Sequence, residues 1–375
     1  MNILYFHPHF TYPGGAGKFV LETGERLAKM GHSVTVLAQS GDEAIIGDYP
    51  NIEFKFIGGP LPNTMSHWLQ FPILMKRIFE ATKGMDIDII FPQAFPANYW
   101  GFLFKRKNPD IPCIWYCHDL GSFIYQKDLI MGLKNPIKTM AIAANPFVKK
   151  IDKQLIKNVD AIVTNSHFTS KFIHNTYALT SKVIYPGVDI NKFKPLNEKE
   201  NIVFNASRLY KFKKVDILIK AMSSIKNAQL YIAGDGEEKD NLVNLTNELG
   251  ITDKVFFTGN LNDEQLNNYY SKAKVVVFPA ENEAFGIAQL EAMAAGTPAI
   301  STRSGGVVET ILDNETGFLV ESNNIDEIST KIKEILDDDE LCISMAKKAR
   351  IHVENNFTWD IAAKRLDEFF LQIGG

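Results

Sequence analysis

Cysteine is scarce in this chain, which has only Cys113, Cys117 and Cys342 among 375 residues. The first two lie close together, but no second pair completes a zinc site, so we expect all three to be reduced, buried and structural. Long apolar runs are also missing, because none reaches the roughly 18 residues that a membrane-spanning helix needs. The chain enters the strand-like segment NILYF at once, without the basic start and apolar run of a signal peptide. We therefore expect a cytoplasmic protein.

An excess of positive charge is absent as well. The 40 Lys and Arg residues face 44 Asp and Glu residues, for a net charge of −4. A nucleic-acid-binding domain needs a strongly basic surface, so we expect no nucleic-acid partner. The 45% hydrophobic and 22% charged content is typical of a soluble globular protein, and the length predicts two domains rather than one core.

Short runs rich in β-branched residues alternate with helical patterns from one end of the chain to the other. Near-continuous apolar strands separated by helices are typical of parallel sheets covered on both faces, which is the doubly wound α/β class. The predicted strands are ILYF, SVTVLA, IEFKFI, IDIIF, CIWYC, AIVTN, SKVIY, NIVFNAS, QLYIAG, KVFFTG, KVVVFP and TPAIST.

The alternation breaks at 185–201, which is rich in Pro, Lys and Asn and predicts a linker. We therefore expect two Rossmann-like domains, at 1–190 and 191–357. The segment 358–375 has the pattern of an amphipathic helix, and we expect it to pack back on the first domain.

The segment FPAENEAFGIAQLEAMAAGTPAI predicts a strand, a loop and an Ala-rich helix that begins at about Phe285. The free amides of Phe285, Gly286 and Ile287 would form an anion-binding helix start. Glu283 lies in the loop, and Glu291 lies on a helix that is apolar nearly all round. A buried carboxylate needs partners, which are either a cation or backbone amide of the protein or the vicinal hydroxyls of a ligand such as a ribose.

Other polar residues follow predicted strands, where ligands bind in open α/β sheets. Arg208 and Lys213 follow NIVFNAS and could hold a diphosphate without a metal, or could simply be solvated surface charges. His118 follows CIWYC and could be an active-site group at the end of a strand, or a satisfied polar group. The pair Gly14 and Gly15 opens a predicted helix, where an amide of Gly15 or Ala16 could face a phosphate.

Two other segments resemble known ligand-binding motifs but do not match them in sequence or position. YPGGAGKF lacks the first glycine and the final Ser or Thr of a P-loop. Asp86 and Asp88 resemble a metal-binding D-x-D pair but stand where a strand begins, which is the wrong end of a sheet for a ligand. We expect no metal site and no cofactor apart from the co-substrate.

EAFGIAQLEAMAAGTP resembles the E-x-F-G-x-x-x-x-E signature of retaining nucleotide-sugar glycosyltransferases of the GT-B fold, family 4. RLYKFK is similar to the R-L-x-x-x-K segment of that family, although Lys214 stands where the family usually has Gly. YPGGAG, YCHDLGSF and YPGVDINKFKP are also family-like, although Gly17 departs from the usual Glu or Ala. The resemblance is weak from about Ile45 to Lys107 and from Phe123 to Lys157.

The resemblance implies an enzyme that moves a sugar from an NDP-sugar to a hydroxyl of a glycan or lipid-linked acceptor. It implies catalytic roles for His118, Glu283, Arg208 and Lys213, with Arg208 and Lys213 on the diphosphate, Glu291 on the ribose and Glu283 on the sugar. The implied donor-binding residues are Gly14, Gly15, Ala16, Arg208, Lys213, Asn260, Leu261, Glu283, Ala284, Phe285, Gly286, Ile287 and Glu291.

Two other functions stay open on sequence grounds. One is a sugar-nucleotide epimerase-like enzyme on the same fold, and the other is a non-catalytic nucleotide-sugar binding protein. The segments 67–79 and 132–151 mix Lys with apolar residues, as interfacial helices do and as ordinary core-facing helices also do, and the latter is our expectation. Peripheral contact with the inner face of the membrane remains an alternative for them.

Overall fold

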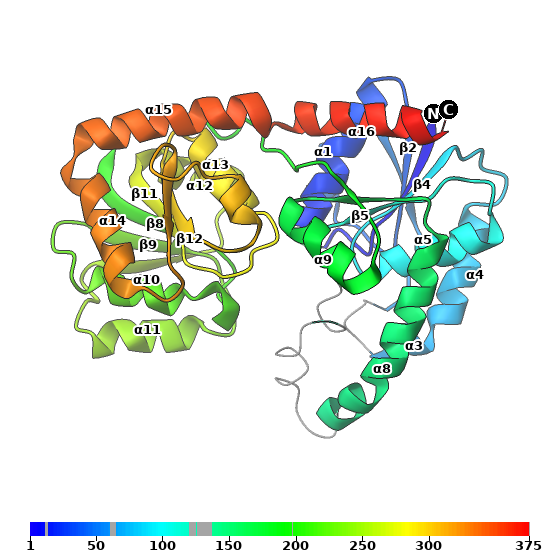
Figure 1. The fold of residues 1–375 in the computed structure, drawn as a ribbon, viewed down its shortest axis with the longest axis horizontal. Helices are drawn as coiled ribbons and strands as arrows, with labels where there is room; N and C mark the ends of the chain where they lie inside the picture. The colour runs from blue at the N-terminus through cyan, green and yellow to red at the C-terminus, as the bar shows by residue number, and fades with distance from the viewer. Residues whose placement is uncertain (12–13, 61–64, 120–124, 126–136, 197, 375) are drawn as a thin grey trace. The chain divides into compact units, whose positions relative to one another are not determined.

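The computed structural model describes residues 1–11, 14–60, 65–119, 125, 137–196 and 198–374. The chain forms two compact units. Unit 1 comprises Met1–Tyr185 together with Trp359–Gly375, and unit 2 comprises Pro186–Thr358. The sequence predicted boundaries at residues 190 and 357. Figure 1 shows a sheet with surrounding helices in each unit.

The strands of unit 1 are all parallel. One sheet has the order β3-β2-β1-β4, and another has the order β5-β6-β7. A bridge between Ile90 and Cys113 links β4 to the segment just before β5. The strands are β1 (Asn2–Phe6), β2 (Ser33–Ala38), β3 (Ile52–Phe56), β4 (Ile89–Pro92), β5 (Ile114–Cys117), β6 (Ala161–Thr164) and β7 (Lys182–Val183).

The helices of unit 1 bury apolar residues against these strands, with Trp100 and Phe102 of α5 at the centre of the core. All three cysteines of the chain are free and buried, as predicted. The helical elements are α1 (Gly15–Lys29), α2 (Glu43–Ile46), α3 (Met65–Leu69), α4 (Phe71–Ala81), α5 (Ala97–Lys107), α8 (Ile137–Leu155), η1 (Ile156–Asn158), α9 (His167–Tyr177) and α16 (Trp359–Gly374).

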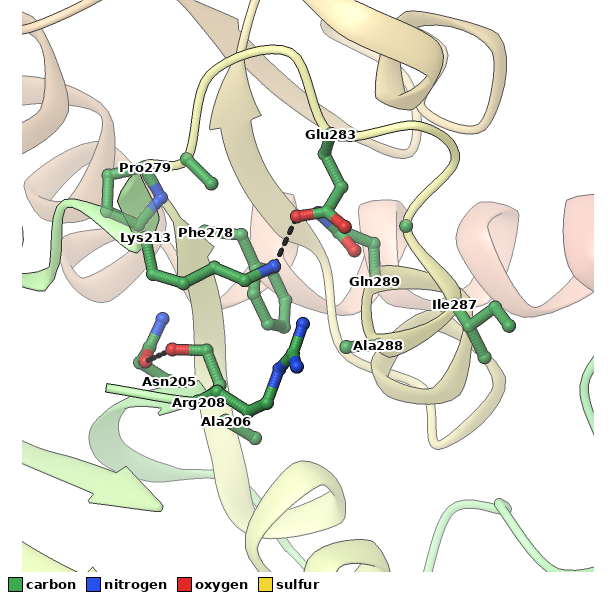
Figure 2. Close-up of a pocket in the computed structure, with 13 residues that line it drawn as sticks. Asn205, Ala206, Arg208, Lys213, Phe278, Pro279, Glu283, Ile287, Ala288 and Gln289 are labelled. Carbon is green, nitrogen blue, oxygen red and sulfur yellow. Dashed lines mark hydrogen bonds and ion pairs between the residues drawn. The ribbon is translucent and has the colours of Figure 1, made fainter. Parts of the chain in front are cut away.

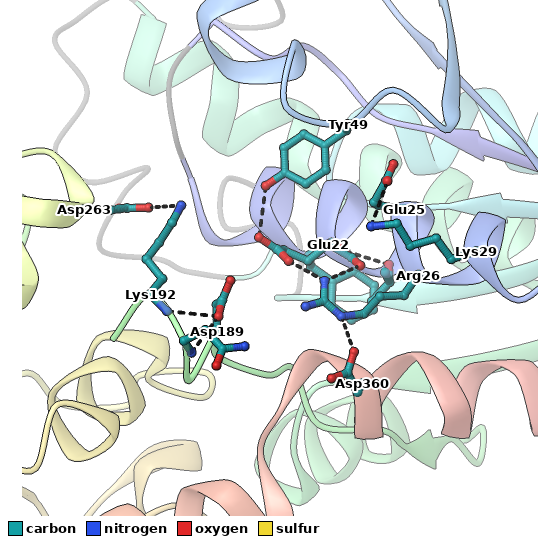
Figure 3. Close-up of polar contacts among 12 residues, drawn as sticks. Glu22, Glu25, Arg26, Lys29, Tyr49, Asp189, Lys192, Asp263 and Asp360 are labelled. Carbon is teal, nitrogen blue, oxygen red and sulfur yellow. Dashed lines mark hydrogen bonds and ion pairs between the residues drawn. The ribbon is translucent and has the colours of Figure 1, made fainter. Parts of the chain in front are cut away.

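Helix α16 belongs to unit 1 although it ends the chain. It packs against α1 through an apolar face that includes Trp359, Leu366 and Phe370, all fully buried. Polar contacts support this packing at its edge (Figure 3). Arg26 on α1 donates to Asp360 at 2.6 Å and to Glu22 at 2.5 Å. The chain therefore leaves unit 1, builds unit 2 and returns.

The segments with a mixed apolar and basic pattern fall in unit 1. Helix α4 turns Leu74, Met75 and Ile78 into the core, which agrees with the core-facing interpretation. Helix α8 leaves Phe147 and Ile151 exposed, and the part of its segment from 132 to 136 lies outside the described residues. Across the described residues, no helix is both long enough and apolar enough to cross a membrane.

The sheet of unit 2 has the order β10-β9-β8-β11-β12-β13, again with all strands parallel. Chain order thus runs outward from β8 to one edge and then reverses at β11 toward the other edge, as in a dinucleotide-binding fold. The strands are β8 (Glu200–Ala206), β9 (Gln229–Ala233), β10 (Val255–Gly259), β11 (Ala273–Phe278), β12 (Ala299–Thr302) and β13 (Gly317–Val320).

Helices of unit 2 bury a second core, to which α10, α14 and α15 contribute. Arg350 on α15 donates to the carbonyl oxygens of Phe193, Ala294 and Ile190 and so ties the entry segment to the end of α13. The helical elements are η2 (Lys211–Lys213), α10 (Val215–Met222), α11 (Lys239–Glu248), α12 (Asp263–Lys272), α13 (Ile287–Ala294), η3 (Gly305–Glu309), α14 (Ile325–Asp337) and α15 (Asp339–Asn356).

The strand predictions were close, with two differences. SKVIY contributes only Lys182–Val183, because the chain leaves the sheet for the linker there. The strand β13 was not predicted, because GFLV is short and begins with glycine. Gly317 is nevertheless required, since a Cβ atom would lie 2.0 Å from the carbonyl oxygen of Ala299 on the neighbouring strand.

Candidate active site

The carboxyl ends of β8 and β11 mark the point where the strand order of unit 2 reverses. Ligands of doubly wound sheets bind at such a point, because the connections leave the two strands in opposite directions. Asn205 at the end of β8 is almost fully buried, and its Nδ2 donates to the carbonyl oxygen of Val277 on β11 at 2.7 Å. This side chain fixes the spacing of the two strands where they diverge.

A cavity of about 180 Å³ lies at this point. It takes its walls from the end of β8, the end of β11, the loop after β11 and the start of α13. The lining residues are Asn205, Ala206, Ser207, Arg208, Lys213, Phe278, Pro279, Ala280, Glu283, Gly286, Ile287, Ala288 and Gln289. The structure thus brings together Arg208, Lys213, Glu283, Gly286 and Ile287 of the predicted donor-binding set.

Arg208, Lys213 and Glu283 direct their charged ends toward the same space (Figure 2). Lys213 forms an ion pair with Glu283, and both side chains are largely buried. The guanidinium of Arg208 lies over the ring of Tyr210 at 5.4 Å and has no carboxylate partner in the described part of the chain. One cation is therefore neutralised within the site, while the other remains available to an anion.

The loop that presents Glu283 is held by its backbone. The amide of Gly306 donates to the carbonyl oxygen of Glu283 at 2.7 Å. A Cβ atom at Gly306 would lie 2.1 Å from the carbonyl oxygen of Ala284, so only glycine allows this close approach. The SGG segment at the start of η3 thus fixes the position of the glutamate.

Helix α13 begins at Ile287, so the predicted start at about Phe285 was wrong by two residues. The reason is Gly286, which adopts a φ of 99° and caps the helix in a left-handed conformation. No side chain caps the helix, so the amides that face an anion are those of the first turn from Ile287.

The other predicted residues of unit 2 lie outside the cavity lining. Glu291 is one turn inside α13 and 7% exposed. The buried phenol of Tyr270 has a raised pKa, chiefly because of its burial and then because of the negative charge of Glu291. Asn260 and Leu261 follow β10 at the edge of the sheet. Ala284 and Phe285 lie in the loop between Glu283 and the helix, with Phe285 buried.

In unit 1, His118 follows β5, and its ring is held among neighbours from other elements. Its Nε2 lies 3.0 Å from Oε1 of Gln93, and its carbonyl oxygen accepts from Nδ2 of Asn165 at 2.8 Å. Burial lowers the pKa of His118 to about 3, so the ring is neutral at physiological pH. His7, which follows β1, also has a lowered pKa, chiefly through burial and then through its electrostatic interaction with His118.

The Gly-Gly loop lies where predicted, at the start of α1. Gly14 precedes the helix in an extended conformation, and Gly15 and Ala16 are its first residues. No side chain caps this helix, so its first amides are free of an intrahelical partner. Tyr12 and Pro13, which precede the loop, lie outside the described residues.

A metal site is not found in the described ranges, where no group of three His, Cys, Asp or Glu side chains converges. The D-x-D pair lies before β4 at the amino end of the strand. Asp86 accepts from the side chain of Asn2 at 3.1 Å, and Asp88 accepts from the amide of Asn2 at 2.6 Å. Both carboxylates therefore accept hydrogen bonds from the first residue of β1, at the amino end of the sheet.

Three uncharged polar residues that line the cavity were not predicted from the sequence, namely Asn205, Ser207 and Gln289. The segment NAS after a buried strand was a signal that could have found the first two, since polar residues at a strand end point to a site. Gln289 is buried in the first turn of α13, and no sequence signal marks it.

The contacts of Lys214 explain how this chain accommodates a lysine at a position where the family usually has glycine. It adopts a φ of 52° and a ψ of 35°, in the left-handed region. Its Nζ forms an ion pair with Glu281 and donates to Oδ1 of Asn323 at 2.8 Å. The consecutive lysines 213 and 214 thus each bind a glutamate of the same loop, and the second pair compensates for backbone strain.

The comparisons with known proteins agree with this geometry. The family described as Glycosyltransferase Family 4 matches residues 13–192, and the family described as Glycosyl transferases group 1 matches residues 188–352. The chain is 26% identical to D-inositol 3-phosphate glycosyltransferase of Corynebacterium aurimucosum over 95% of this chain and 90% of that protein.

Two solved structures show the same fold. Sucrose-phosphate synthase from Thermosynechococcus elongatus superposes with a TM-score of 0.82 at 23% identity, over 99% of this chain and 98% of the other. Anabaena HepE, solved in complex with UDP and glucose, superposes with a TM-score of 0.79 at 19% identity, over 98% of each chain.

The fold is therefore that of the GT-B glycosyltransferases. The two family matches together extend from residue 13 to residue 352, and the chain belongs to the group 1 and family 4 glycosyltransferases. It is an enzyme of the glycosyltransferase class.

Replacing Lys214 should separate the ion pair from the backbone strain. We expect Lys214→Ala to lower stability, because it removes the pair and keeps a side chain in the left-handed region. Lys214→Gly removes the same pair but relieves the strain, so it should be more stable than Lys214→Ala by about 1 kcal/mol. Thermal unfolding of both variants at pH 7 measures this order, and equal stability of the two would contradict it.

The pH dependence provides a control. The hydrogen bond from Lys214, followed by that from Ser322, holds the pKa of Glu281 below its usual value of 4.5. A depressed carboxylate pKa stabilises the fold fully above pH 4.5, and this contribution is lost as the pH falls through the lower folded-state value. The stability advantage of wild type over Lys214→Ala should therefore shrink on acidification below pH 4.5.

Proposed function

We propose that this enzyme is a retaining glycosyltransferase that moves a sugar from an NDP-sugar to a hydroxyl of a glycan or lipid-linked acceptor, without a metal ion. The observation that carries the proposal is the convergence of Arg208, Lys213 and Glu283 on one cavity at the strand reversal of unit 2. The UDP and glucose named for the Anabaena structure support a nucleotide-sugar donor.

The cations of the cavity suit a diphosphate. Arg208 has no carboxylate partner among the residues that the structure describes, and Lys213 can exchange Glu283 for a phosphate oxygen. Charge-assisted hydrogen bonds to phosphate are among the stronger polar contacts in proteins, and the uncapped start of α13 adds backbone donors. This donor set supports leaving-group stabilisation by the protein itself.

Glu283 suits the transferred sugar. Once a diphosphate engages Lys213, the carboxylate is released to accept from sugar hydroxyls, and the backbone contact with Gly306 keeps it at the cavity wall. Because the ion pair holds Glu283 close to the diphosphate site, we assign it to positioning of the sugar rather than to nucleophilic attack. Transfer would then proceed on one face of the sugar, through positioning and stabilisation of the departing diphosphate.

Glu291 would bind the ribose, and Asn260 and Leu261 would line the base, as the resemblance implies. His118 and the loop at Gly14, Gly15 and Ala16 would act from unit 1 on the sugar and acceptor. An epimerase-like enzyme and a non-catalytic binding protein remain the rivals, and the family matches favour neither. Donor turnover that does not require an acceptor would identify the epimerase-like enzyme.

The deciding experiment is a thermal-shift screen against UDP-, GDP- and ADP-sugars, with and without EDTA. A ligand at 100 times its Kd adds about 2.7 kcal/mol to stability. We expect one base to raise the melting temperature equally in both conditions, and turnover with that donor to give a product that keeps the anomeric configuration. Stabilisation only with added Mg²⁺ or Mn²⁺, or an inverted product, would overturn the corresponding part of the proposal.

Arg208→Met and Lys213→Met should each weaken binding of the free nucleoside diphosphate roughly 10- to 100-fold, because each loses a charge-assisted contact of about 1.5–3 kcal/mol. Lys211→Met is the matched control, because it removes a lysine from the same turn that does not line the cavity. Calorimetry decides the point. Affinity of both cavity variants equal to that of the control would exclude the diphosphate role.

Substitution of the two glutamates should affect nucleotide binding and turnover in different ways. Glu283→Gln loses its contact with the sugar and releases Lys213, so nucleoside diphosphate affinity should be retained or increased while turnover falls. Glu291→Gln should weaken diphosphate and donor binding together, by about 1–3 kcal/mol, as for a buried acceptor that loses hydroxyl donors. A lower melting temperature for Glu291→Gln with unchanged nucleotide affinity would instead show a purely structural glutamate.

We further propose peripheral contact with an anionic membrane through α8, which would bring the enzyme to a lipid-linked acceptor. Phe147 and Ile151 are exposed one turn apart, with the exposed Lys150 between them. Apolar residues flanked by lysine suit the boundary of an anionic bilayer.

Wild type should co-sediment with phosphatidylglycerol vesicles more than with phosphatidylcholine vesicles. The double variant Phe147→Ser and Ile151→Ser should lose this binding and keep its donor affinity, and a wild type that binds neither vesicle refutes the contact.

A further inference from the structure

The strand reversal of unit 1 carries polar side chains beside His118 that the proposed function leaves unexplained. The order β3-β2-β1-β4, extended through the bridge to β5, reverses between β1 and β4. His7 follows β1, Gln93 follows β4 and His118 follows β5. These residues thus occupy the same topological position in unit 1 that Asn205 and the cavity occupy in unit 2.

Gln93 is fixed by its own hydrogen bonds. Its side chain is 1% exposed, and its Nε2 donates to the carbonyl oxygen of Phe91 at 3.2 Å. That bond orients the amide so that Oε1, which can only accept, faces Nε2 of His118 at 3.0 Å. The proton in this contact therefore belongs to the histidine, on Nε2.

A neutral histidine with its proton on Nε2 has a lone pair on Nδ1. No hydrogen bond reaches Nδ1 of His118 from the described residues, and this atom is not among the buried polar atoms that lack a partner. Nδ1 is therefore open to solvent or to a ligand, as an acceptor and not as a donor.

The remaining neighbours hold the ring in place. Phe19 on α1 packs edge to face against the ring of His118, with ring centroids 5.1 Å apart. Asn165 after β6 donates a hydrogen bond to the carbonyl oxygen of His118. Two titratable groups contact or face the ring among the described residues. His7 is buried and its lowered pKa keeps it neutral, and the phenol of Tyr116, whose ring lies 4.7 Å from that of His118, has a pKa raised by burial and is neutral too. Neither of these two groups carries a positive charge that would compete with the acceptor role of Nδ1.

We propose that Gln93 is a positioning residue that sets the tautomer of His118, so that Nδ1 accepts a hydrogen bond from a hydroxyl of the sugar substrate. This inference rests on the proposed function for the identity of that hydroxyl. The tautomer itself is a property of the free enzyme. Gln93 acts through His118 and does not need to touch the substrate.

The test uses the full chain labelled with ¹⁵N-histidine, with the signals of His118 assigned as those lost in His118→Phe. Long-range ¹H–¹⁵N spectra distinguish the two neutral tautomers. We expect wild type to show the Nε2–H form of His118. Gln93→Met keeps the volume of the side chain but removes the acceptor, so the Nδ1–H form should become populated. A wild-type His118 in the Nδ1–H form, or a tautomer unchanged in Gln93→Met, would overturn the inference.

Turnover with the donor found in the screen gives the second readout. Gln93→Met should lower kcat roughly 3- to 10-fold, the loss expected for one hydrogen bond, with a smaller change in donor KM. Gln39→Met is the matched control, because Gln39 is equally buried after the neighbouring β2 but bonds to Pro60. A fall in melting temperature shared by both variants, with kcat equal to wild type in both, would show that Gln93 is merely structural.

Gln93→Glu provides the rescue. It keeps an acceptor at the same atom and so keeps the Nε2–H tautomer at high pH, where its kcat should approach that of wild type. Its carboxylate favours the imidazolium, which protonates Nδ1, so its kcat should fall on acidification where wild type stays flat. A profile parallel to wild type would overturn the inference. If wild type turns over no nucleotide sugar, the proposed function fails, whereas the tautomer spectra still decide the role of Gln93.

Discussion

The ion pair between Lys213 and Glu283 is the contact on which the organisation of unit 2 depends. It joins the turn after β8 to the loop after β11, the two segments that diverge at the strand reversal. Asn205 spaces the strands beneath it, Gly306 holds the loop, and Lys214 repeats the pairing one residue further along. In the proposed function, a diphosphate that enters the cavity would replace a bond within the protein, so donor binding and release of Glu283 would be the same event.

Each unit uses its strand reversal differently. Unit 2 gathers charge there, in Arg208, Lys213 and Glu283, with glycines that bring backbone close to the cavity. Unit 1 gathers neutral polar groups, in which Gln93 and Asn165 hold His118 at its ring and at its backbone. A charged site suits a diphosphate, whereas a neutral, oriented site suits sugar hydroxyls, whose recognition depends on donor and acceptor direction.

The sequence predicted most of the strands, the class of fold and the charged residues that converge on the cavity, because buried parallel strands are continuous apolar runs and their ends are polar. It could not predict that Lys213 pairs with Glu283, since 70 residues separate them and only the sheet order brings them together. It misplaced the start of α13 because the apolar pattern runs through Gly286, whose positive φ appears only in the folded chain. The role of Gln93 also escaped it, because a glutamine after a strand gives no signal until its amide is oriented by Phe91.

The return of α16 to unit 1 has a consequence for synthesis on the ribosome. Unit 2 is one continuous segment whose ends meet, since Val188 bonds to Phe357 and pairs with Thr358. Unit 1, in contrast, lacks one aromatic partner of Phe19 and one of Phe91 until Trp359 and Phe370 have been made. Multidomain chains generally fold from the N-terminus as they emerge. Here the unit that begins the chain is the last to be completed, so its uncovered aromatic face must wait for the final helix.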